Sequence, residues 1–124
     1  MIYHFEQLDV WKESKQLTLN IYKLLSAVKD YDFKSQIQRA SVSIMNNIAE
    51  GFDRNKNDQS NKAFVYFLNM SYGSCGEVRS MLYLAEELGY LDQITAEQLR
   101  KDCVSISNKL YAFMQMLQNT PKPK

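Results

Sequence analysis

Apolar residues recur every three or four positions over most of the chain, which is the spacing of one face of an α-helix. The first such segment covers about residues 8–28, where the spacing is set by Val10, Leu17, Ile21, Leu24 and Val28. A second covers about residues 35–50 and is followed by Gly51, the residue type best able to take the left-handed conformation that ends a helix. The pattern predicts two helices, with residues 29–34 connecting them.

The longest periodic segment, about residues 60–88, alternates steps of four and three, which is the heptad seam of helices that pack side by side. Its seam residues are Phe64, Leu68, Ser71, Cys75, Val78, Leu82 and Ala85. Gly89 predicts its end. A fourth helix is predicted from Thr95, because Gln98 three residues later completes a capping box and a seam continues from Leu99 to Leu117. A loop is predicted over residues 53–59, which are rich in Asn and Asp.

Residues that interrupt helices are few. The 124 residues include four glycines and two prolines, both prolines near the C-terminus, and short β-branched runs between helices are missing. We therefore predict an all-α protein, an antiparallel up-down four-helix bundle over residues 1–118 with a flexible tail over 119–124. No apolar run approaches the roughly 20 residues that cross a bilayer, and no signal peptide begins the chain, so a cytoplasmic location without membrane contact is expected.

The residue types needed for catalysis or metal binding are scarce. A di-iron bundle requires paired Glu-x-x-His motifs, and nucleophilic catalysis by Cys or Ser requires a base, yet the one histidine is His4, outside the predicted helices. Cys75 and Cys103 fall on seams, where a thiol usually acts as a small apolar residue. Gly73 and Gly76 lie inside a helix and form no phosphate loop. We expect no enzyme activity, no cofactor and no metal.

Charge limits nucleic-acid binding to local patches. Fifteen basic and fourteen acidic residues leave a net charge of +1, which generates no strong overall field. Two groups of basic residues are candidate nucleic-acid contacts: Arg54, Lys56 and Lys62 near the second interhelical turn, and Lys12, Lys15 and Lys23 on one face of the first helix. Taken alone, each group is better explained as ordinary solvated surface, and only repetition around a ring would favour binding. Neither a groove-reading motif nor an aromatic stacking platform is recognisable, so any binding should depend little on base sequence.

Gly73 and Gly76 require an explanation, because glycine inside a helix costs about 1 kcal/mol relative to alanine. Apolar residues surround more than half of this helix. Either the helix is central and a neighbour packs closely on the glycines, or the surface is a subunit interface, which we favour because three neighbouring helices rarely cover so wide a face. The candidate interface residues are Tyr66, Met70, Gly73, Gly76 and Leu84.

A row of polar residues lies on one side of the second helix and is either a solvated face or a functional one: Arg39, Ser43, Asn46, Asn47 and Glu50. The surrounding segment 36–51, QIQRASVSIMNNIAEG, followed by Phe52 and Arg54, resembles the signature of the family of four-helix bundle proteins known from intervening sequences in bacterial 23S rRNA genes. Residues 5–22 and 67–91 are similar to the family's first and third helices, so the resemblance covers nearly the whole chain.

The resemblance implies an up-down bundle that assembles into a ring, typically a homopentamer, with a suspected role in binding RNA or other nucleic acid. A related branch, the accessory protein of diversity-generating retroelements, partners a reverse transcriptase. The family's signature positions, none of them an established catalytic residue, correspond here to Arg39, Ser43, Asn47, Glu50, Gly51, Gly73 and Glu77. Met45 and Gly76 depart from the family's usual proline and helix former, and the nearly neutral charge is unusual for a partner of nucleic acid.

Two functions remain open at this point. The chain is either a non-enzymatic oligomeric scaffold whose assembled surface binds RNA, DNA or a nucleic-acid enzyme, or a homo-oligomeric protein-interaction module with no nucleic-acid role. Ring symmetry would multiply a small basic patch on each subunit, whereas scattered lysines would gain nothing from it.

Overall fold

The structure is a computed structural model that describes residues 1–57 and 60–119. Within those residues it contains a short 3-10 turn and four α-helices, and no strand. Their order along the chain is η1 (Phe5–Gln7), α1 (Asp9–Leu24), α2 (Tyr31–Asn55), α3 (Lys62–Glu87) and α4 (Gln93–Asn119). The predicted all-helical fold with four helices is therefore confirmed.

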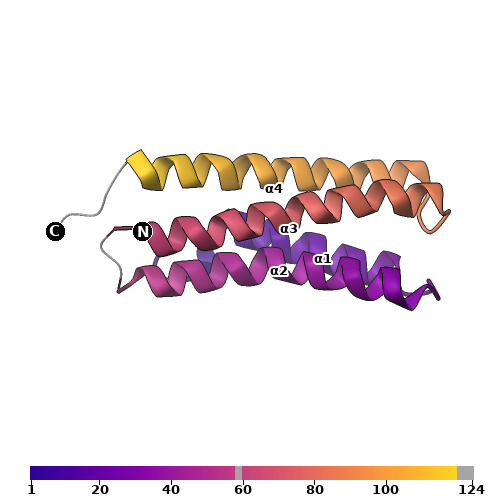
Figure 1. Cartoon of the computed structure of the whole chain (residues 1–124), viewed down its shortest axis with the longest axis horizontal. Coiled ribbons are helices and arrows are strands. Elements are labelled where there is room, and N and C mark those ends of the chain that lie inside the picture. The colour runs from indigo at the N-terminus through magenta and orange to yellow at the C-terminus, as the bar shows by residue number, and fades with distance from the viewer. Residues whose placement is uncertain (58–59, 120–124) are drawn as a thin grey trace.

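The four helices lie lengthwise beside one another (Figure 1). α2 packs against α1 and α3, and α4 packs against α3 and α1. The α1–α2 and α3–α4 connections lie at the same end of the bundle, on the right in Figure 1. They are joined there, because the Tyr90 hydroxyl donates a 2.6 Å hydrogen bond to Asp30 Oδ2 and the Tyr90 ring packs edge-on against Phe33.

The predicted seams form the core between the helices. Each helix contributes large side chains that are almost completely buried: Leu17 and Ile21 from α1, Ile37, Ile44 and Ile48 from α2, Leu68, Val78 and Leu82 from α3, and Ile106 and Leu110 from α4. Burial of one such side chain stabilises the fold by about 1.5–3 kcal/mol. The heptad pattern thus identified the core of α3 correctly, whereas Leu24, predicted on the apolar face of the first helix, is 47% exposed because α1 ends there.

Aspartates, rather than the predicted signals, begin two of the helices. α2 starts at Tyr31, inside the segment predicted as a connection, because Asp30 accepts a 3.2 Å hydrogen bond from the Phe33 backbone N–H. α4 starts at Gln93 because Asp92 accepts a 2.7 Å hydrogen bond from the Thr95 backbone N–H. The capping box predicted at Thr95 is wrong.

Gly51 does not end α2, which continues to Asn55 through part of the predicted loop. Instead, Gly51 is buried where α2 crosses α3. A Cβ atom at this position would lie 2.8 Å from Phe67 Cβ and 3.0 Å from Phe64 Cδ1, so only glycine allows the two helices to approach this closely. Gly89, with a φ of +77°, does close α3 as predicted.

Other helix ends also differ from expectation. α1 ends at Leu24, before the predicted residue 28, and α4 extends through Asn119. Residues 120–124, most of the predicted tail, lie outside the described residues, as do residues 58–59 of the predicted loop. None of the helices in the described ranges has the length and apolar character needed to cross a membrane.

Candidate functional site

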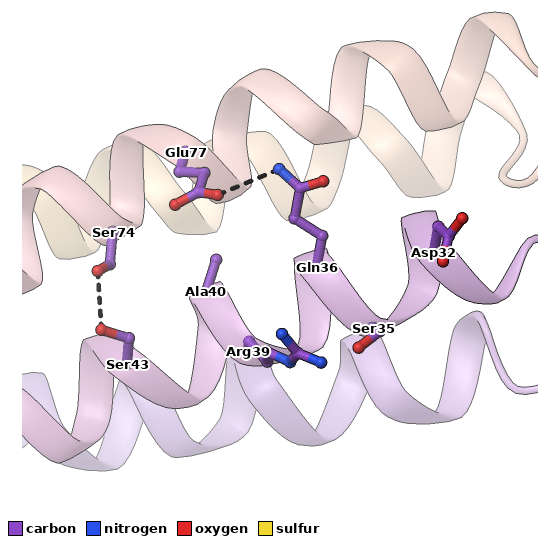
Figure 2. Close-up of a pocket in the computed structure, with 8 residues that line it drawn as sticks. All are labelled: Asp32, Ser35, Gln36, Arg39, Ala40, Ser43, Ser74 and Glu77. Atoms are coloured by element: carbon purple, nitrogen blue, oxygen red, sulfur yellow. Dashed lines mark hydrogen bonds between the residues drawn. The ribbon is translucent and has the colours of Figure 1, made fainter.

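An open polar groove of about 500 Å³ runs between α2 and α3 (Figure 2). Residues spaced three or four apart on α2 form one wall, and one turn of α3 forms the other. The lining residues are Asp32, Ser35, Gln36, Arg39, Ala40, Ser43, Ser74 and Glu77. The groove thus contains three signature positions. Arg39 and Ser43 lie one turn apart on α2, and Glu77 lies on α3.

The middle of the signature row holds α2 against α3. The Ser43 and Ser74 hydroxyls are 2.9 Å apart across the groove, as Figure 2 shows. The Asn47 amide donates to the Ser43 carbonyl oxygen at 2.8 Å and to its hydroxyl at 2.9 Å, which fixes the Ser43 side chain. A buried Ser71 hydroxyl also bonds the α2 backbone, donating to the Ile44 carbonyl at 2.7 Å. These polar positions therefore have a packing role.

The charged members of the groove remain free to contact a ligand. Arg39 is exposed and, among the residues that the structure describes, has no carboxylate within ion-pair distance. Glu77 on the opposite wall is exposed and accepts one long hydrogen bond, 3.5 Å, from the Gln36 amide. The groove thus offers one cation, Arg39, and two carboxylates, Asp32 and Glu77, together with serine hydroxyls, but no nucleophile paired with a base. This arrangement is suited to binding.

The basic group at the end of α2 is largely neutralised by neighbouring carboxylates. Arg54 donates from Nε at 3.1 Å and from Nη2 at 2.9 Å to Glu50 Oε1, so this signature glutamate serves as an ion-pair partner. Lys56 Nζ lies 3.8 Å from Asp53 Oδ1. Lys62, the first residue of α3, is exposed and has no ion pair with any other described residue. Of these three candidates, Lys62 alone is not paired with a carboxylate of the described residues.

The lysines of α1 are not paired with carboxylates of the described residues. Lys12, Lys15 and Lys23 are all exposed, and none forms an ion pair with another residue in the described ranges. The Lys15 ammonium lies 5.2 Å from the centre of the Trp11 ring, an attractive contact that leaves the charge available to solvent. The three residues form the α1 lysine row, which is the better of the two predicted groups for contacting phosphates.

The outer face of α3 carries exposed apolar side chains around its glycines. Tyr66, Met70 and Leu84 are all exposed, as predicted for interface candidates. Both Gly73 and Gly76 are exposed too, and, apart from the adjoining residues and the backbone of α3 itself, no described atom lies within 4 Å of the position that a Cβ would take. Close packing by a neighbouring helix of the same chain is therefore the wrong explanation for these glycines.

The two cysteines are part of the core. Cys75 and Cys103 are both almost fully buried, and the Cys75 thiol donates to the Cys103 carbonyl oxygen at 3.2 Å. The adjacent Cys75 thiol, together with burial, raises the pKa of the Cys103 thiol far above its usual range, so it stays protonated. Across the described residues, no group of three or more His, Cys, Asp or Glu side chains could hold a metal ion.

A second groove, about 440 Å³, lies between α3 and α4 and was not predicted. Its lining residues are Val65, Tyr66, Asn69, Tyr72, Tyr111, Met114, Gln115 and Gln118. No single segment of sequence contains this combination, because Tyr111 lies on a different helix from Tyr66 and Tyr72. The only available signal was that Tyr72 and Tyr111 each lie next to a seam position.

These features define a class: all-helical proteins in which four long helices pack around one apolar core, with a polar groove between the second and third. The chain belongs to the 23S rRNA-intervening sequence protein family, whose sequence profile matches residues 6–112.

Among solved structures, the chain is similar to a protein of unknown function from the S23 ribosomal protein family of Bacteroides thetaiotaomicron. The two share 25% sequence identity with a TM-score of 0.75, over 86% of this chain and 98% of the other. A comparison with curated proteins finds no match. Neither the family description nor the similar structure names an enzymatic activity.

Proposed function

We propose that this protein is a non-enzymatic, homo-oligomeric scaffold: an antiparallel up-down bundle that assembles through the outer face of α3 and binds RNA through the α1 lysine row. The observation that carries the proposal is the open space above Gly73 and Gly76, flanked by exposed Tyr66, Met70 and Leu84. Two glycines weaken a helix by about 2 kcal/mol together, and nothing within the described chain offsets that loss.

A second copy of the chain would offset this loss of helix stability. Glycines allow two helices to approach closely, and the apolar side chains on either side would be buried by the approaching subunit. Between Tyr66 and Leu84 the face is about 27 Å long at 1.5 Å per residue, which suits a contact of roughly 800 Å² per partner. The family resemblance favours a ring of five subunits in the cytoplasm.

RNA is the ligand suggested by the family's description and by charge. A ring would place several copies of the α1 lysine row on one surface, and each lysine that neutralises a phosphate releases counterions, so affinity should fall steeply with salt. DNA and a nucleic-acid enzyme are alternative partners for the same surface.

The second candidate is a homo-oligomeric protein-interaction module with no nucleic-acid role. It is favoured by the pairing of Arg54 with Glu50 and of Lys56 with Asp53, because these carboxylates leave little net charge at that end of the bundle.

Assembly is tested by light scattering of the wild type and of a Tyr66→Glu, Leu84→Glu variant. The wild type should have the mass of several subunits, and the variant should be monomeric with unchanged helical circular dichroism. Tyr31→Glu, at an exposed tyrosine of α2, is the matched control and should stay assembled. A wild-type monomer at micromolar concentration would refute assembly.

RNA binding is tested by titrating labelled RNA at low salt. Replacing Lys12, Lys15 and Lys23 by Gln should weaken binding and flatten the dependence of affinity on salt by roughly one unit for each phosphate that no longer has a lysine partner. The control replaces Lys29, Lys56 and Lys101 by Gln, which removes the same charge elsewhere. Equal effects in the two variants, or no saturable binding by the wild type, would favour the protein-interaction module.

A further inference from the structure

We infer that the groove between α3 and α4 binds unpaired bases of single-stranded nucleic acid. The inference rests on the proposed RNA-binding role but uses different residues from the α1 lysine row. It begins with the aromatic rings. Tyr66, Tyr72 and Tyr111 are 60%, 38% and 56% exposed, and all three line the groove. Exposed rings on one surface are what proteins use to stack successive bases of a single strand.

Carboxamide groups accompany the rings. Asn69 of α3 and Gln115 and Gln118 of α4 also line the groove, and within the described chain none of these three side chains has a hydrogen-bond partner. Each offers two N–H donors and one carbonyl acceptor, the groups that pair with the edges of a base. The buried Met114 forms part of the apolar floor.

Charge favours a nucleic-acid strand over an acidic or basic peptide. No charged residue lines the groove itself, so the part of the ligand that enters should be flat and uncharged, as a base is. Lys62 precedes Tyr66 by one helical turn, about 6 Å, and Arg79 follows Tyr72 by two turns, about 10 Å. Neither cation forms an ion pair with a described residue, and both are exposed. The groove is thus flanked along α3 by two cations that can contact phosphates.

The groove and the proposed subunit contact adjoin along α3, because Gly76 lies one turn after Tyr72 on nearly the same side of the helix. Tyr72 lies on the side of α3 that faces α4, about a quarter to a third of a turn from Gly73 and Leu84 on the outer face. Tyr66 lies at the edge of both surfaces, so it is left unchanged in the test. The residues that distinguish the groove are Tyr72 and Tyr111.

The experiment compares the full-length wild type with a Tyr72→Leu, Tyr111→Leu variant, which keeps apolar bulk but removes the stacking rings. The probe is a labelled single-stranded RNA of about ten nucleotides, and the competitors are an RNA duplex of the same length and a mononucleotide. Affinity for the single strand should fall roughly 5- to 150-fold for each base stack removed, at every salt concentration, with the salt slope unchanged. Tyr72→Phe with Tyr111→Phe should restore binding, because phenylalanine stacks as well.

The matched control is Tyr3→Leu with Tyr31→Leu, at two exposed tyrosines away from the groove, and it should bind as the wild type does. The inference would be overturned if the duplex competed as strongly as the single strand. It would also be overturned if the mononucleotide, at an equal concentration of bases, competed as strongly as the single strand. Unchanged single-strand affinity in the Leu variant with loss of self-association would assign the groove to a subunit contact instead.

The outcomes also separate this inference from the proposed function. If the lysine-to-Gln variant loses RNA and the Tyr72, Tyr111 variant does not, RNA binding stands and the groove inference fails. If the tyrosine variant alone loses RNA, the groove stands and the α1 lysine row is not the contact.

Discussion

Replacing Gly51 by alanine should destabilise the bundle, although alanine is the better helix former. The added Cβ would lie 2.8 Å from Phe67 Cβ and 3.0 Å from Phe64 Cδ1, closer than carbon atoms approach without displacement. Phe67 Cβ is attached directly to the α3 backbone and cannot move away alone, so the helices must separate. Overpacking of this kind costs about 1–3 kcal/mol, against a gain of about 1 kcal/mol in helix propensity.

Gly73→Ala is the matched control, because it adds the same methyl group to a helix at a position where no described atom of another helix lies within 4 Å. The propensity gain is common to both substitutions, so their difference in unfolding free energy isolates the packing cost, about 1–3 kcal/mol. The measurement is urea unfolding followed by circular dichroism, at constant m-value, in chains that also carry Tyr66→Glu and Leu84→Glu to exclude the effect of association. Equal stability of Gly51→Ala and Gly73→Ala would refute the close approach of α2 and α3.

Three further predictions concern helix ends and the core. The hydrogen bond from Tyr90 lowers the pKa of Asp30. The stabilisation from this bond is therefore present above the usual Asp pKa and is lost as the pH falls through the lowered pKa. The urea midpoints of the wild type and of Tyr90→Phe should differ at neutral pH and converge in acid. The same bond raises the pKa of Tyr90, so its effect should also disappear as pH rises through that raised value. Asp92→Ala should cost about 1 kcal/mol by removing the α4 cap, whereas Asp92→Asn should retain most of it in the same unfolding assay. Cys75 and Cys103 should not react with a thiol reagent in the native protein and should react fully in urea; rapid native reaction would contradict their burial.

The helices and the core were predictable because burial imposes a period that the sequence records directly. Helix ends were harder, since several residues compete as caps. Asp92 and Thr95 are both capable N-caps three positions apart, and the periodic pattern alone does not choose between them. Gly51 was misassigned for a related reason: glycine both ends helices and allows close contacts, and only the position of α3 distinguishes the two uses.

The candidate site was predictable in part. Glu50 precedes Arg54 by four residues, a spacing that brings side chains together on a helix, so the neutralisation of Arg54 was available from sequence. The hydrogen bond between Ser43 and Ser74 and the presence of Tyr72 and Tyr111 in one groove were not predictable. Both depend on the register between two helices, which is fixed by the whole of the core and by no local motif.

The glycines of α3 also affect how this helix moves. α3 is 26 residues long, about 39 Å, and its middle turn carries hydrogen atoms in place of side chains on the outer side. The backbone of Gly73 and Gly76 is therefore open to water in a single subunit, and we expect amide exchange at these two residues to be faster than in the flanking turns, where Leu68 and Leu82 are buried. We therefore expect the middle turn of α3 to be softer than the two halves that it joins, and a subunit that covers this turn should also make the helix more rigid.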